Sequence, residues 1–368
     1  MTVRRARWCA ATAPCLGCAF RSSTPLRFFV SLLDAERGGQ WSITPLGGAQ
    51  SGGEQRYADD TAVLTTTLTA DGGVVEVTDF LALRTGADLA EIAPATRSQF
   101  VRLVRVVAGT VELQIEFAPP RAQCDFDRLG GGWSITSPDH PGLPLHLRSS
   151  HPLRPAEDGA LTATIALRAG QTYDSSLSWS PPDRQGGHTG LSASAQCAST
   201  SEVWRRWASG IVYEGPQRHL VRRSALTLKV LDHASTGAIT AAATSSLPEW
   251  VGGQRNWDYR YTWVRDAAFS TYALRRIGLT SEANAFLSWT LECAERDGGP
   301  SIMYALDGGQ PSEERTDPQL RGWRNSAPVR WGNGHPGRPN TMSTANCSTW
   351  PTNGCEPAAR STTISGQR

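Results

Sequence analysis

The 368-residue sequence has little net charge, because 36 Lys and Arg side chains stand against 34 Asp and Glu, for a formal charge of +2. We therefore expect no nucleic-acid or membrane-surface partner, since either needs a strongly basic field. Lysine is almost absent, and Lys229 is the only one. No apolar run approaches the roughly 18 residues of a membrane-spanning helix.

The eight cysteines are scattered, and only Cys15 and Cys18 form a C-x-x-C pair. No second pair lies at a spacing typical of zinc sites and no histidine cluster accompanies it, so we expect no metal site. The simplest interpretation is a reduced, cytoplasmic protein. A secreted, disulfide-bonded binding protein is an alternative, which an unchanged gel mobility on reduction would exclude.

The chain changes character along its length, which predicts a multidomain β + α protein. Residues 1–27 have no regular period and are expected to be disordered. Residues 28–180 contain short alternating segments of Val, Thr and Leu, which are typical of an antiparallel β-sandwich. Residues 181–199 have the Pro, Gly and Ser content of a linker. Helical spacing follows over residues 200–333, and the tail 334–368 has the composition of a disordered segment.

Turn and cap residues set the expected boundaries of these elements. Ala108-Gly109 is interpreted as a turn between two strands. Gly278 is expected to end a helix over Val264–Ile277, and Thr280 to cap a second helix over Ser281–Arg296. The expected strands are Ala62–Thr69, Gly73–Phe80, Ser98–Val107, Val111–Phe117, Trp133–Thr136, Leu143–Arg148, Leu161–Leu167 and Tyr173–Trp179.

Residues 256–266, here called the aromatic stretch, hold four aromatic rings, two acids and two arginines. Rings offer flat apolar faces, while Asp and Arg offer acceptors and bidentate donors. That mixture suits a sugar, with hydroxyls around its rim and C–H groups on its faces. A structural aromatic cluster with surface ion pairs is the alternative. Trp133 and Trp179 are weaker candidates for sugar binding, because lone tryptophans in a sandwich are usually core.

The aromatic stretch resembles glycoside hydrolase family 15, which contains glucoamylases, trehalases and glucodextranases. The likeness is strongest from Asn256 to Ala267 and includes Arg223–Lys229 before it. Residues 29–45 and 57–80 resemble the trehalase-like N-terminal domain of bacterial members. The resemblance implies a β-sandwich followed by an incomplete (α/α)6 barrel, the six-hairpin glycosidase fold.

The resemblance also implies a sugar site. Arg265 and Asp266 would bind hydroxyls of the terminal glucose, with Tyr259 and Trp263 lining the same pocket. Trp331 lies where the family lines the neighbouring site. The implied ligand is an α-glucoside such as a malto-oligosaccharide, trehalose or a related glucan, and no cofactor is implied.

The family hydrolyses glycosidic bonds with inversion, using two glutamates in motifs beyond Pro328–Arg330. Neither motif occurs in this sequence, so no residue receives a catalytic role. Glu313 and Glu314 are expected in a solvated loop. Asp258 and Arg260 are expected to form an ion pair behind the pocket.

Both ends depart from the family pattern, before residue 28 and after about residue 335. We interpret both as translated out of frame, which reading the DNA in the other two frames would test. Two hypotheses follow: an exo-acting, inverting α-glucoside hydrolase that is active only with the complete frame, or a non-catalytic sugar-binding or structural fragment. An incomplete barrel exposes apolar helix faces, so we expect poor solubility and no glucose release from maltose, trehalose or dextrin by this chain.

Overall fold

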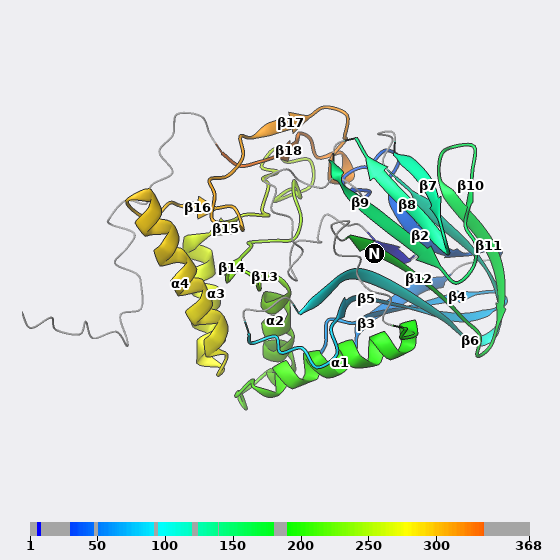
Figure 1. Ribbon diagram of the computed structural model, residues 1–368, viewed down its shortest axis with the longest axis horizontal. Coiled ribbons are helices and arrows are strands. Elements are labelled where there is room, and N and C mark those ends of the chain that lie inside the picture. Colours follow the sequence, from blue (N-terminus) through cyan, green and yellow to red (C-terminus); the bar gives the residue numbers. More distant parts are fainter. Residues whose placement is uncertain are drawn as a thin grey trace, which may run out of the picture.

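The computed structural model describes residues 6–8, 30–47, 51–91, 95–119, 124–138, 140–179 and 190–334 (Figure 1). We expect disorder in residues 1–27 and 334–368, and nearly all of these residues lie outside the described ranges. The exception at the N-terminus is the backbone of β1 (Ala6–Trp8), which pairs with β2 (Gln40–Pro45).

A 12-stranded antiparallel sheet forms the N-terminal part of the protein, which confirms the predicted antiparallel β structure. Eight strands follow the order β3-β4-β5-β6-β12-β9-β8-β7, and β2 and β11 also pair with β6. After β1 and β2, the strands are β3 (Ser51–Tyr57), β4 (Leu64–Ala70), β5 (Gly73–Leu83), β6 (Thr96–Ala118), β7 (Asp125–Leu129), β8 (Gly132–Ser137), β9 (His140–Ser149), β10 (Arg154–Pro155), β11 (Leu161–Arg168) and β12 (Thr172–Trp179).

Strand β6 is the common element of this sheet, and it corrects one prediction. Its first half pairs with β5 and β12, and its second half with β2 and β11. The turn predicted at Ala108-Gly109 is wrong, because β6 continues through both residues. Gly109 takes a φ of 75° there, and the pairing with β5 shifts register between Val74 and Val75. A bulge of this kind bends a strand without ending it.

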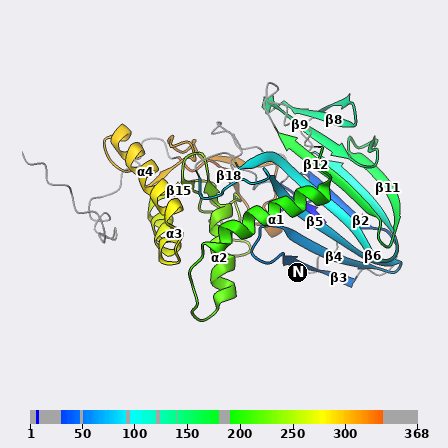
Figure 2. The same cartoon turned by 60° about the horizontal axis from the view of Figure 1, so that its bottom comes forward.

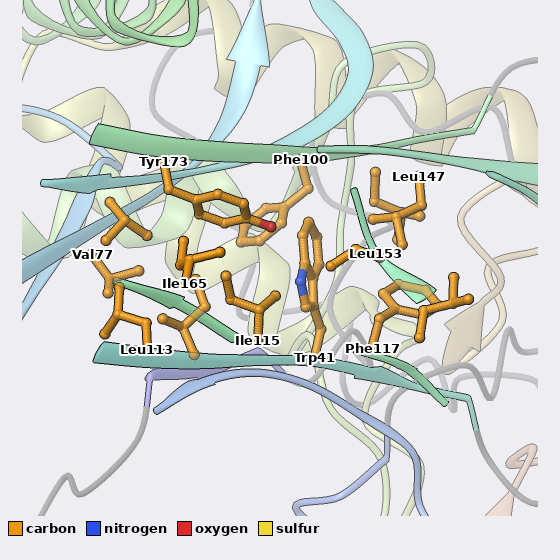
Figure 3. Packing of buried hydrophobic residues seen from close by; sticks show 14 of the residues in the cluster. Trp41, Val77, Phe100, Leu113, Ile115, Phe117, Leu147, Leu153, Ile165 and Tyr173 are labelled. Atoms are coloured by element: carbon orange, nitrogen blue, oxygen red, sulfur yellow. The ribbon is translucent and has the colours of Figure 1, made fainter. Parts of the chain in front are cut away.

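The bend brings the two halves of the sheet face to face around one apolar core (Figure 3). Trp41 of β2 is fully buried at its centre. Its ring meets Phe100 and Phe117 edge-on, with centroids 5.9 and 5.8 Å apart. These two phenylalanines come from opposite halves of β6. The core therefore lies between two parts of the sheet that both contain this strand. Trp179 is only 4% exposed in the same core, which favours its structural role.

Four α-helices follow the sheet: α1 (Ala193–Ser209), α2 (Arg218–Val230), α3 (Val264–Arg276) and α4 (Thr280–Asp297). Helix α1 begins inside the range expected as a linker, because the Ser192 hydroxyl caps it by accepting from the Ala195 N–H at 3.2 Å. Residues 181–189 of that linker lie outside the described residues. Thr280 is the first residue of α4 instead of its cap, and Gly298 ends α4 with a φ of 72°.

The described residues contain four α-helices, too few for a closed barrel of six helix pairs, and the predicted incomplete (α/α)6 barrel stays a prediction. A 3₁₀ turn (Trp323–Asn325) and six short strands complete the helical region. These strands are β13 (Asp232–His233), β14 (Ala238–Ile239), β15 (Thr262–Trp263), β16 (Met303–Tyr304), β17 (Arg315–Asp317) and β18 (Val329–Trp331). None of the helices in the described ranges has the length and apolar character needed to cross a membrane.

Helix α1 joins the helical region to the sheet by lying beside β5 (Figure 2). The Leu83 N–H of β5 donates to the Thr200 hydroxyl of α1 at 3.1 Å. Helix α2 adds a second link, because Arg222 donates to both carboxylate oxygens of Asp60, at 2.8 and 2.7 Å. The sheet and the helices therefore form one packed unit.

Candidate functional site

The end of the aromatic stretch is positioned by a short strand that leads into a helix. Strand β15 pairs with β16, and the Val264 N–H donates to the Ile302 carbonyl at 3.1 Å. Helix α3 begins at Val264, so Arg265 and Asp266 both lie in its first turn. The helix dipole favours a negative charge there, which suits the Asp266 carboxylate.

Arg265 and Asp266 form an exposed ion pair, with Nη2 and Oδ2 3.1 Å apart. Their side chains are 63% and 50% exposed. An ion pair this exposed adds little to stability, because water competes for both partners. The guanidinium donors and the carboxylate acceptors are therefore both available to the hydroxyls of a ligand.

Trp263 and Tyr259 are half-buried, and each side chain has one polar group, the indole Nε1 and the phenol hydroxyl. The Trp263 ring packs against Tyr261 and Met303, and the Arg265 guanidinium carbon lies 6.0 Å from its centroid. The buried Trp263 Nε1 has no hydrogen-bond partner among the described residues. Burial raises the pKa of the Tyr259 hydroxyl, and the charge of Glu249 raises it further, so this hydroxyl stays a donor.

The predicted ion pair of Asp258 and Arg260 is confirmed, and it lies beneath the surface. Arg260 donates to the two Asp258 oxygens from Nε at 2.8 Å and from Nη2 at 2.5 Å. The Gly332 N–H donates to the same carboxylate at 3.0 Å. Asp258 is fully buried, so its charge fixes the loop and is not presented to a ligand.

Further hydrogen bonds that sequence reasoning missed tie the aromatic stretch and the earlier pair Ser245-Ser246 to residues 326–330. The Asn256 Nδ2 donates to the carbonyls of Ser326 and Pro328, both at 3.1 Å. The hydroxyls of Ser245 and Ser246 donate to the Arg330 carbonyl at 2.7 and 2.6 Å. The family resemblance includes the segments that contain these residues. No local sequence pattern, however, indicates that the segments are hydrogen-bonded to one another.

Glu314 is less solvated than we expect from the sequence. Its Oε1 accepts from the Arg330 Nε at 3.0 Å, and its side chain is 34% exposed. The same guanidinium lies 4.7 Å from the Trp257 ring centroid. The carboxylate is therefore engaged in holding the loop, whereas Glu313 is exposed as predicted.

The structure does not bring Trp331 to the surface with the other predicted site residues. Its side chain is 3% exposed and packs with Val30 and Leu33, which precede β2. Its Nε1 donates to the Asp317 Oδ2 at 3.1 Å. In this structure the ring is a core group, and the segment around residues 30–33 covers it.

Among the described ranges, no group of three or more His, Cys, Asp or Glu side chains is placed to hold a metal ion. The Arg265–Asp266 pair is exposed, Tyr259 and Trp263 are half-buried, and the Asp258 scaffold is buried. Polar and aromatic groups of these kinds suit a ligand with both hydroxyls and apolar faces.

Two family models match the chain. The model "Glycosyl hydrolases family 15" covers residues 215–341, and the model "Trehalase-like, N-terminal" covers residues 21–130. A trehalase of Mycolicibacterium smegmatis is 33% identical over 344 residues, which are 86% of this chain and 50% of the relative. A trehalase of Thermoplasma volcanium is 32% identical over 317 residues, which are 83% and 48%. The chain thus spans about half the length of the curated relatives it matches.

Among solved structures, a bacterial glucoamylase complexed with acarbose aligns with a TM-score of 0.53. The alignment covers 70% of this chain and 44% of the glucoamylase, at 13% identity. At that identity the likeness concerns the fold alone.

Proposed function

The chain belongs to glycosyl hydrolase family 15 and has a trehalase-like N-terminal region, and from this we propose that its aromatic stretch holds the terminal glucose of an α-glucoside. One observation carries this proposal: Arg265 and Asp266 stand exposed on the first turn of α3, beside the half-buried Trp263. Hydrogen-bond donors, hydrogen-bond acceptors and an aromatic face thereby lie close together, and a pyranose ring can contact all three.

Trehalose is the first ligand to test, because several relatives that align with most of this chain are named trehalase. A malto-oligosaccharide is the second, because the structural neighbour is a glucoamylase. Both present a terminal α-linked glucose, and that shared group is the one we assign to Tyr259, Trp263, Arg265 and Asp266. We assign no ligand contact to Trp331, because its ring is buried.

The reaction we propose for the family-length protein is exo-acting, inverting hydrolysis of α-glucosides. Inversion needs a general acid and a general base about 6.5–9.5 Å apart, with a water between the base and the sugar. We propose that this chain binds without hydrolysing, because its sequence contains neither family glutamate motif. The non-catalytic sugar-binding fragment is therefore the better description of the chain as given.

The four helices are, in this proposal, the first part of an (α/α)6 barrel. Phe269 and Tyr272 of α3 and Leu291 of α4 support it, because they are 66%, 48% and 53% exposed. Large apolar side chains gathered on neighbouring helices favour a covering element. We also propose a cytoplasmic setting, which the thiols of Cys197 and Cys293 support because they form no disulfide within the described part of the chain.

A binding titration with matched variants tests the ligand assignment. Trehalose and maltose are titrated calorimetrically into the wild-type chain and into Arg265→Ala and Asp266→Asn. We expect each substitution to weaken affinity by at least about tenfold, the loss of roughly one charge-assisted hydrogen bond. Arg206→Ala is the control, because Arg206 makes a similarly exposed ion pair with Glu202 at 3.2 Å on α1.

Equal affinities in wild type, Arg265→Ala and Arg206→Ala would remove the assignment of the site. Glucose release is measured on the same samples. Turnover by the wild-type chain that Asp266→Asn abolishes would show that the chain is an enzyme, against the non-catalytic description.

A further inference from the structure

A hollow of about 120 Å³ lies on the sheet, at the hairpin of β7 and β8. This hairpin and helix α3 stand at opposite ends of the molecule (Figures 1 and 2). Its lining combines an indole, three polar side chains and an apolar base: Trp133, Arg128, Ser149, His151, Leu147 and Leu153. The site proposed at the aromatic stretch uses none of these residues.

The Trp133 ring is held in place by residues of the neighbouring strand. Trp133 and Arg128 are directly opposite each other in the β7–β8 pairing. The Arg128 guanidinium carbon lies 5.4 Å from the indole centroid. Phe126 meets the indole edge-on, with centroids 6.4 Å apart and the rings at 89°. A ring fixed in advance loses little conformational entropy when a ligand stacks on it.

Polar groups surround an apolar floor in this hollow. Leu147 and Leu153 are 0% and 2% exposed. The Ser149 hydroxyl is fixed by the His151 carbonyl at 2.5 Å and the Tyr173 hydroxyl at 2.9 Å. The exposed side chains of Arg128 and His151 add hydrogen-bonding groups at the rim. A sugar ring presents this same combination of C–H faces and peripheral hydroxyls.

The mouth of the hollow is open at the hairpin turn. Gly131 takes a φ of 83°, which the turn requires, and a Cβ placed on it would meet nothing within 4 Å. The volume is well below the roughly 300–1,000 Å³ of pockets that enclose a drug-sized ligand. The hollow therefore suits one ring, with the remainder of a longer ligand in solvent.

We propose that this hollow is a second, non-catalytic site for one glucosyl ring of an α-glucoside, stacked on Trp133. The ligand class rests on the function proposed above, whereas the site itself rests on the β7–β8 hairpin. Because the two sites lie at opposite ends of the molecule, the second one would attach the protein to a glucan chain without presenting that ring for cleavage.

Calorimetry with maltotriose, read as the number of sites per chain, tests the proposal. We expect two sites in wild type, one in Trp133→Ala, one in Arg265→Ala, and none in the double variant. Trp133→Phe keeps an aromatic face, so it should retain the second site with weaker affinity. Trp323→Ala is the control, because Trp323 is also half-buried beneath an arginine, with the Arg324 guanidinium 4.6 Å from its ring.

The outcomes separate the two proposals. If Trp133→Ala retains both sites and unfolds in urea like wild type, the second site is wrong. If Trp133→Ala lowers the number of sites while Arg265→Ala does not, the hollow binds sugar and the assignment of the aromatic stretch fails. If Arg265→Ala binds inorganic phosphate but not maltotriose, Arg128 and His151 bind an anion and the sugar assignment is overturned.

Discussion

Replacing Lys229 by Met should destabilise the protein strongly, because this lysine is buried between two acids. Its Nζ lies 2.7 Å from the Asp232 Oδ2 and 3.0 Å from the Glu282 Oε1. The three side chains are 5%, 6% and 2% exposed. Methionine keeps an unbranched side chain one atom shorter but removes the charge, which leaves two buried carboxylates without their cation. Breaking a buried pair in this way costs about 3–5 kcal/mol of unfolding free energy.

The charge balance of this cluster sets the pH dependence of the effect. Burial alone would lower the pKa of Lys229, but the carboxylates of Asp232 and Glu282 offset this and raise it. Burial raises the pKa of Asp232, against the pull of Lys229, since one lysine faces two acids. Without the lysine, Asp232 favours the protonated form still more. The loss in Lys229→Met should therefore be largest at neutral pH and shrink as the pH falls.

Urea unfolding followed by tryptophan fluorescence measures this loss, and Trp207 reports on the cluster because its Nε1 donates to the Glu282 Oε1 at 2.6 Å. Arg218→Met is the matched control on the same helix. Arg218 pairs with Glu214 at 3.2 Å, but the two side chains are 52% and 79% exposed. We expect its substitution to change stability by less than about 0.5 kcal/mol. A cost for Lys229→Met as small as that of Arg218→Met would refute the reasoning.

Two further predictions concern buried and interfacial acids. Asp258→Asn leaves Arg260 and the Gly332 N–H without their charged acceptor, so the unfolding free energy in urea should fall by about 3 kcal/mol; an unchanged value would mean that the pair is dispensable. The hydrogen bond from Arg222 holds the pKa of Asp60 below its ordinary 3.8, so the stabilisation is present above that value and is lost as the pH falls through the lower folded-state pKa. Asp60→Asn should therefore flatten the decline of stability between pH 5 and about pH 2, and parallel pH profiles would count against it.

The boundaries that sequence patterns placed well are those that local chemistry decides. Helix α3 ends at Arg276, two residues before the predicted stop at Gly278, and Gly298 ends α4 in a left-handed conformation. The prediction of a turn at Gly109 is wrong for the opposite reason, because the deciding contacts are not local. A turn and a bulge both use a left-handed glycine, and only the strands paired on either side of β6 distinguish them.

The candidate site shows the same division between local and distant contacts. Asp258 and Arg260 are two residues apart, so their ion pair could be predicted from the sequence alone. The burial of Trp331 could not, because it depends on Val30 and Leu33, which are about 300 residues away in the chain. No local pattern around Trp331 indicates that another part of the protein covers it.

The aromatic stretch divides by depth into a part that folds and a part that can bind. Asn256 and Asp258 are fully buried and hydrogen-bonded to residues 326–332. By contrast, the side chains of Arg265 and Asp266 are 63% and 50% exposed and form an ion pair with each other. A substitution within residues 256–266 can therefore lower sugar affinity in two ways, by disturbing the scaffold or by removing a binding group. Asp258→Asn should lower affinity and unfolding free energy together, because it disturbs the loop that carries the binding residues. Arg265→Ala should lower affinity at constant unfolding free energy, and measuring both quantities on both variants separates a binding group from the scaffold that carries it.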